Sequence, residues 1–179
     1  TLTLGNSTLT FGDATNQTFA GAVSGAGGLV KQGTGIQTLS GVNTFSGGLN
    51  LTAGGLLLGN NSAIGSGALT VSGNSSLDGS AALNLANAIN LGAALTLTGG
   101  QNLTLGGNIT GTGSLTKNGA SLLTLNGINT FSGGLNLNAG SLLLGNGGAL
   151  GSGVLNVSGS ASLDGSAALN LANNVTLGN

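Results

Sequence analysis

Short segments in which leucine alternates with asparagine or threonine recur along the whole chain. Examples are 49–51 (LNL), 83–85 (LNL) and 103–105 (LTL). Successive side chains of a β-strand point to opposite sides, so this alternation places the leucines on one face and the polar side chains on the other. Glycines and Asn-Gly pairs between the segments mark turns. No segment has the 3.6-residue period of an amphipathic helix, and we therefore predict an all-β protein.

The sequence repeats itself with an offset of 86 residues, since the block at 28–60 returns at 114–146. A second block, SLDGSAALNLAN, occurs unchanged at 76–87 and 162–173. This self-similarity predicts one repetitive domain over the whole chain. Its predicted parts are the end of a preceding repeat (1–24), repeat one (25–110) and an incomplete repeat two (111–179).

Stacking explains how such short segments can bury their leucines. Residues 25–110 hold about twelve segments, and three segments per coil predict about four coils of ~21 residues per repeat, or about eight coils in the chain. The predicted fold is thus a parallel β-helix, or β-solenoid, with three short strands per coil. Three or five coils per repeat stay open. The alternative, an antiparallel sandwich or barrel, favours strands of about 5–6 residues and hairpin turns.

Substitutions between the two copies suggest which positions face the interior. Exchanges of one aliphatic residue for another are typical of a packed core. We expect this of Ile36/Leu122, Val42/Ile128, Ile64/Leu150 and Ile89/Val175. The exchange of Val30 for Thr116 indicates a position in the wall of the solenoid, near solvent.

The composition limits the classes of function that this protein can have. Among 179 residues there are 38 glycines, two basic and three acidic residues, and no histidine, cysteine or proline. With so few acidic groups and no histidine or cysteine, little remains for acid–base catalysis or metal ligation. Two lysines provide no footprint for phosphates, which disfavours nucleic-acid binding. We therefore expect no enzyme, no catalytic residue, no cofactor and no metal site. No run of ~20 apolar residues predicts a membrane-spanning helix.

Residues 111–166 resemble the autotransporter passenger-associated β-strand repeat. That family joins G-x-G-x-L-x-K-x-G to a short strand and an N-T-[FY]-[ST]-G-G box. Copy two carries the pattern at Gly111, Gly113, Leu115, Lys117, Gly119, Leu123, Thr124, Leu125, Gly127, Asn129, Thr130, Phe131, Gly133 and Gly134. The resemblance implies a right-handed parallel β-helix that forms a stalk or fibre on the exterior of a bacterial cell. It implies no catalytic residues.

Asp78 and Asp164 occupy equivalent positions and are candidates for calcium binding or catalysis. They lie about four predicted coils apart, or ~19 Å, and cannot share one ion. Calcium prefers ~6–8 oxygen ligands. We therefore predict that each is a turn residue whose carboxylate accepts backbone N–H bonds.

The other repeated polar residues also have structural interpretations. Lys31 and Lys117 are expected to be solvated turn residues, worth only ~0–1 kcal/mol in an exposed ion pair. In the boxes at 43–48 and 129–134, the asparagine is expected to bind backbone, the phenylalanine to fill the core and the glycines to turn the chain. Pairs of threonines raise a remote ice-binding alternative, but they are sporadic: Thr1/Thr3, Thr8/Thr10 and Thr96/Thr98.

The sequence thus predicts a structural segment of a long extracellular fibre or stalk, located outside the cell or on its surface. The alternative is an adhesin passenger that binds a host or carbohydrate ligand. The expected partners are flanking repeats or other copies of the chain, end to end, with no nucleic acid, membrane insertion or small-molecule substrate. The chain opens with TLTLGN and closes with VTLGN, in phase with the repeat. We interpret this as a cut from a longer array or as a protomer that docks head to tail.

Overall fold

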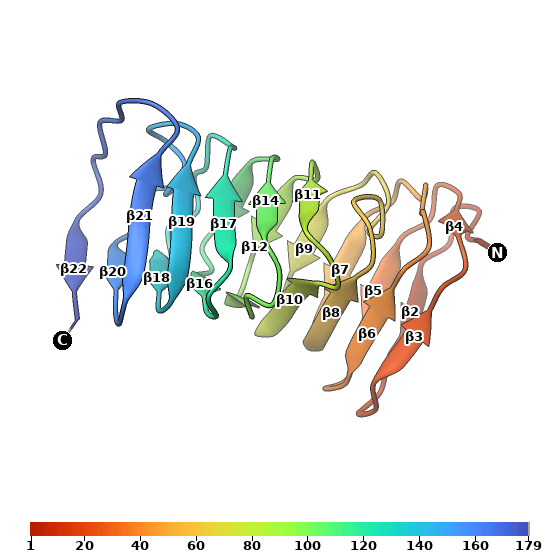
Figure 1. Cartoon of the computed structure of the whole chain (residues 1–179). Helices are drawn as coiled ribbons and strands as arrows, with labels where there is room; N and C mark the ends of the chain where they lie inside the picture. Colours follow the sequence, from red (N-terminus) through yellow and green to blue (C-terminus); the bar gives the residue numbers. More distant parts are fainter. Residues whose placement is uncertain (179) are drawn as a thin grey trace.

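The chain forms a parallel β-solenoid, which confirms the predicted fold class. A computed structural model describes residues 1–178, with the two ends of the chain at opposite ends of the stack (Figure 1). Asn179, which closes the predicted second repeat, lies outside the described residues. All strand pairs of the described chain are parallel. No helix in residues 1–178 is long and apolar enough to cross a membrane.

The strands line three faces, which we name I, II and III. Face I is a nine-stranded sheet, made of β3 (Gln17–Phe19), β6 (Ile36–Leu39), β8 (Gly54–Leu58), β10 (Ser75–Gly79), β13 (Leu95–Leu97), β16 (Leu115–Lys117), β18 (Leu135–Leu137), β20 (Leu155–Val157) and β22 (Val175–Leu177). Face II begins with a six-stranded sheet, made of β2 (Leu9–Phe11), β5 (Leu29–Lys31), β7 (Leu49–Leu51), β9 (Leu69–Val71), β12 (Ile89–Leu91) and β15 (Ile109–Gly111).

Face III holds two separate sheets. The first pairs β1 (Leu2–Thr3) with β4 (Val23–Ser24). The second contains β11 (Leu83–Leu85), β14 (Leu103–Leu105), β17 (Leu122–Leu125), β19 (Gly140–Leu144) and β21 (Ala161–Gly165). Between them lie the box at 43–45 and a turn at 62–64, which stack in the same column because Asn43 bonds to Val23 on one side and to Ala63 on the other.

One coil takes about twenty residues. On face II, Leu29 pairs with Leu49, Leu49 with Leu69, Leu69 with Ile89 and Ile89 with Ile109. The stack therefore has about nine turns, where ~21 residues per coil predicted about eight. The shorter coil follows from its very short strands, most of which contain three residues joined by tight glycine turns.

The interior is a set of stacked aliphatic columns. Leu85 is fully buried while Asn84 is exposed, as the alternation predicts. Leu171, the equivalent of Leu85 in copy two, packs against the core and is partly buried in the last turn. Each buried leucine or isoleucine removes apolar surface from water, worth about 1.5–3 kcal/mol per side chain. The coils thus share one continuous core.

The repeat does not contain the twelve segments predicted from the sequence. Between β5 and β15, eleven strands and two non-strand segments line the faces, which makes thirteen. The segment missing from the prediction is Ala63-Ile64, whose two side chains are buried although they lie in a turn. It shows no alternation, so the strand pattern could not reveal it. Thirteen segments at three per turn give four turns and a third per 86 residues.

One of the predicted interior pairs, Val42/Ile128, is wrong, and a second, Ile36/Leu122, is wrong at Ile36, since Leu122 is half-buried. Val42 and Ile128 are 65% and 68% exposed, and Ile36 is also an exposed side chain. They precede the box or open a strand at a corner of the coil, where the side chain faces solvent rather than the core. The pair Ile64/Leu150 is buried as predicted. Ile89 is buried as well, whereas its equivalent Val175 is exposed in the last turn.

Candidate functional site

The two lysines lie inside the solenoid, which contradicts their interpretation as solvated turn residues. Lys31 and Lys117 are each 1% exposed. Each is the third residue of its strand, on the same side as Leu29 in β5 or Leu115 in β16. In the column of face II, Lys31 is paired with Phe11 on one side and with Leu51 on the other. The aliphatic stem therefore continues the apolar column.

Backbone carbonyls surround each ammonium group. The Lys31 Nζ donates to the carbonyl oxygens of Gln32 (2.7 Å), Gly33 (3.0 Å) and Ala53 (3.3 Å). Lys117 repeats the arrangement at Asn118 (2.7 Å), Gly119 (2.8 Å) and Ala139 (3.4 Å). We call this set of three carbonyls the carbonyl cage. It ties the turn after the lysine to the turn of the next coil, because its third oxygen comes from 22 residues further on.

The glycine of the K-x-G motif makes the carbonyl cage possible. Gly33 and Gly119 have φ of 72° and 70°, in the left-handed region that favours glycine. A Cβ at Gly33 would lie 2.3 Å from the Asp13 carbonyl oxygen, and one at Gly119 would lie 2.6 Å from that of Thr98. Only glycine therefore allows both the turn and the close approach of the neighbouring coil.

Burial lowers the pKa of both lysines below their ordinary value of 10.5. A carboxylate opposes this shift in each case, Asp13 for Lys31 and Asp78 for Lys117. Asp13 is exposed, and hydrogen bonds from the Thr15 hydroxyl and backbone N–H lower its own pKa. Each internal cation thus has one carboxylate near it, Asp13 for Lys31 and Asp78 for Lys117.

The box has the structural role expected from its sequence. Phe45 and Phe131 are fully buried. The Asn129 Oδ1 accepts the Ile109 N–H at 2.7 Å, and its Nδ2 donates to the Ala149 carbonyl at 2.6 Å. Its side chain thereby adds to the backbone hydrogen bonds that join the box to the coils on both sides. Asn43 does the same in copy one, at 2.8 Å and 2.6 Å. Gly48 and Gly134 both turn the chain at a φ of 82°.

Asp78 and Asp164 accept backbone N–H bonds, as predicted, but they lie in strands rather than in turns. Asp78 accepts from the N–H groups of Gly79 (2.8 Å) and Gly100 (2.9 Å) and from the Thr98 hydroxyl. Asp164 accepts from the Gly165 N–H at 2.8 Å. The two carboxylates belong to faces I and III, on β10 and β21. In residues 1–178 no three His, Cys, Asp or Glu side chains gather as a metal-binding set.

The threonine pairs do not form one array. Thr3 lies on β1 of face III, Thr10 on β2 of face II and Thr96 on β13 of face I. The face II column that contains Thr10 continues with Val30, Asn50 and further residues rather than with threonine alone. A flat threonine surface, which the ice-binding alternative requires, is therefore not assembled by these pairs.

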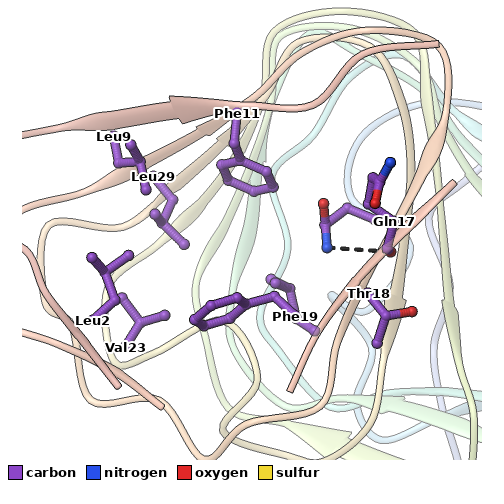
Figure 2. Close-up of a pocket in the computed structure, with 10 residues that line it drawn as sticks. Leu2, Leu9, Phe11, Gln17, Thr18, Phe19, Val23 and Leu29 are labelled. Carbon is purple, nitrogen blue, oxygen red and sulfur yellow. Dashed lines mark hydrogen bonds between the residues drawn. The ribbon is translucent and has the colours of Figure 1, made fainter. Parts of the chain in front are cut away.

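An apolar hollow lies at the first coil, where the core opens at the end of the stack. Figure 2 shows Leu2, Leu9, Phe11, Phe19 and others converging on a cavity of about 220 Å³. Beneath it, the Gln37 Nε2 donates to the Gln17 carbonyl at 3.2 Å. The lining is mostly the inward side of the first strands. The cavity is thus the uncovered interior of the solenoid rather than a pocket built into its wall.

Comparison with known proteins identifies the repeated unit. The profile of the passenger-associated-transport-repeat family matches residues 29–58 and 115–144. No curated protein and no solved structure matches the chain. The two matches run from β5 to β8 and from β16 to β19, and each contains a buried lysine, its carbonyl cage and a box. Residues 29–58 and 115–144 are therefore two passenger-associated transport repeats, as the resemblance of the sequence implied.

Proposed function

We propose that this chain is a non-catalytic structural segment of an extracellular bacterial fibre or stalk, continued end to end by flanking repeats or by other copies. The repeats and the β-solenoid fold fit an autotransporter passenger segment, and that family indicates a secreted or surface-exposed protein. The observation that carries the proposal is the continuous stack of coils, in which parallel ladders and one shared core join each coil to the next.

The coil stack supports a mechanical role. Neighbouring coils are joined by parallel backbone ladders on every face and by side chains that reach about twenty residues along the chain. The Asn87 Nδ2 donates to the carbonyls of Gly65 and Gly67, and the Asn173 Nδ2 to those of Gly151 and Gly153. In such a stack, stability is approximately a sum of coil terms and coil–coil terms. Adding coils therefore lengthens the rod without weakening it.

Both ends present apolar side chains that a further coil would cover. At the last coil, Val175 and Leu177 are 51% and 75% exposed. At the first coil, Leu9 and Phe19 are exposed beside the cavity of Figure 2. A further coil of the same kind, whether from a flanking repeat or from another copy, would pair these strand edges and cover these side chains.

The two end coils also offer their faces in the same order. The first coil runs through β1 on face III, β2 on face II and β3 on face I. The last coil runs through β21 on face III, then 169–171, then β22 on face I. Residues 169–171 lie on face II. The Asn173 side chain that follows them bonds to the carbonyls of Gly151 and Gly153 in the coil before. That coil is joined in turn to the face II box of copy two by the bond from Asn129 to Ala149. A second copy can therefore seat β1, β2 and β3 on the matching faces, in phase.

Electron microscopy and sedimentation over a range of protein concentrations test the proposal. Rods that lengthen with concentration are expected. Leu177→Lys, which places a charge in the end surface, should shorten them, whereas Thr176→Lys on the outward side of the same strand should not. A chain that stays a single short rod at every concentration would contradict assembly. Binding to a glycan array by such single rods would favour the adhesin alternative.

A further inference from the structure

Equivalent parts of the two copies lie on different faces of the solenoid. Lys31 belongs to β5 on face II, whereas Lys117 belongs to β16 on face I. The box of copy one bridges β4 and the turn at Ala63 on face III. The box of copy two continues face II, since Asn129 binds Ile109 of β15. Copy two is therefore displaced by one face relative to copy one.

The number of segments explains this displacement. Each repeat contributes thirteen segments, of which β5 to β15 supply eleven and the box and the Ala63-Ile64 turn supply two. Three segments complete one turn, so twelve segments would return each copy to its own face. The thirteenth segment carries the next copy one face further. The buried, non-alternating pair Ala63-Ile64 thus takes part in setting the orientation of the following repeat.

We propose that this 86-residue repeat generates a threefold screw, in which each repeat rotates the same surface by about a third of a turn. Four turns and a third advance it by ~21 Å, at ~4.8 Å per turn. Three repeats, or thirteen turns, return it to the starting side after ~62 Å. The rotation within the chain stands on its own, whereas its consequence for a long fibre rests on the proposed function.

The rotation determines how a fibre meets its surroundings. The exposed corner beside each box is formed by Val42 and Thr44 in copy one and by Ile128 and Thr130 in copy two. Successive corners point to different sides of the fibre. A partner that lies along one side therefore reaches equivalent corners every ~62 Å rather than every ~21 Å. Such a fibre has no preferred side, and multivalent binding along one side requires a partner that spans this distance.

Distances between pairs of spin labels test the rotation in the single chain, which contains no native cysteine. Val30→Cys/Thr116→Cys labels equivalent positions of the two copies. The control, Val30→Cys/Thr110→Cys, labels two positions in one column of face II, four turns apart. The control distance should be near 19 Å at ~4.8 Å per turn. The equivalent pair should be longer by at least ~4 Å, because packed sheets are ~10 Å apart.

The opposite result is equally clear. If both copies used the same face, the repeat would span a whole number of turns. With four turns the two distances would agree at ~19 Å, and the screw would be refuted. A third pair, Thr116→Cys/Thr176→Cys, spans three turns of face I and should give ~14 Å. Asn50→Cys/Asn136→Cys repeats the test one turn further along if a label at Val30 impairs folding. These distances are measured in isolated chains, so failure of end-to-end assembly leaves them unaffected.

Discussion

Replacing Lys117 with methionine distinguishes an internal lysine from a solvated one. Methionine preserves most of the buried aliphatic stem but removes the ammonium that binds the carbonyls of Asn118, Gly119 and Ala139. A buried polar group that loses its partner costs about 1–3 kcal/mol. Part of the loss for three carbonyls is offset, because the folded chain no longer desolvates a charge. We expect the free energy of unfolding to fall by about 2–4 kcal/mol.

Urea-induced unfolding followed by far-UV circular dichroism measures this change. Lys31→Met should lower the free energy of unfolding by a similar amount, because three carbonyls at equivalent positions of copy one bind the Lys31 ammonium. Asp164→Asn serves as the control for loss of one exposed charge, and substitutions of that kind usually stay within about 0.5 kcal/mol. If Lys117→Met is as mild as this control, the ammonium is not held by the three carbonyls and the lysine is solvated after all.

Three further outcomes follow from the same contacts. Asn129→Ala should lower the free energy of unfolding by about 1–3 kcal/mol in the same urea assay, because two buried backbone groups lose their partner. Leu85→Asp should destabilise by several kcal/mol and Asn84→Asp only slightly, and equal tolerance in thermal melts would disprove the assigned faces. Burial lowers the pKa of both lysines in the folded state. Between the lowered pKa and 10.5, the unfolded chain therefore binds more protons than the folded chain. The free energy of unfolding should rise with pH in this window. The rise should vanish in the Lys31→Met/Lys117→Met double variant when unfolding is compared near pH 8 and pH 10.5.

The position of the lysines could have been predicted from the strand pattern. In 29–31 (LVK) and 115–117 (LTK), the lysine stands two residues after a buried leucine, and the alternation places both on the inner side. Charge and a neighbouring turn favoured an exposed side chain instead. The three carbonyls that accept the ammonium lie in two different coils, and no sequence pattern brings those coils together.

The exposure of the aliphatic side chains at the corners could also be learned only from the structure. The exchange of Val42 for Ile128 resembles a core substitution, yet both side chains face solvent. An exchange of one aliphatic residue for another between the copies is therefore not by itself evidence of burial. The box, in contrast, was predictable, because its asparagine, phenylalanine and glycines each have one local physical role.

The sequence by itself determined the strands, their inward leucines, the glycine turns and the 86-residue repeat, since all of these depend on residues close together in the chain. Only the tertiary structure decided how many segments the 86-residue repeat contains. Ala63-Ile64 fills one side of the fourth coil without forming a strand, because the walls on either side and the coils above and below supply its packing. That contribution changes twelve segments into thirteen and turns copy two to another face. The orientation of each copy around the solenoid axis depends on the total number of segments in the repeat, so no local sequence pattern contains it.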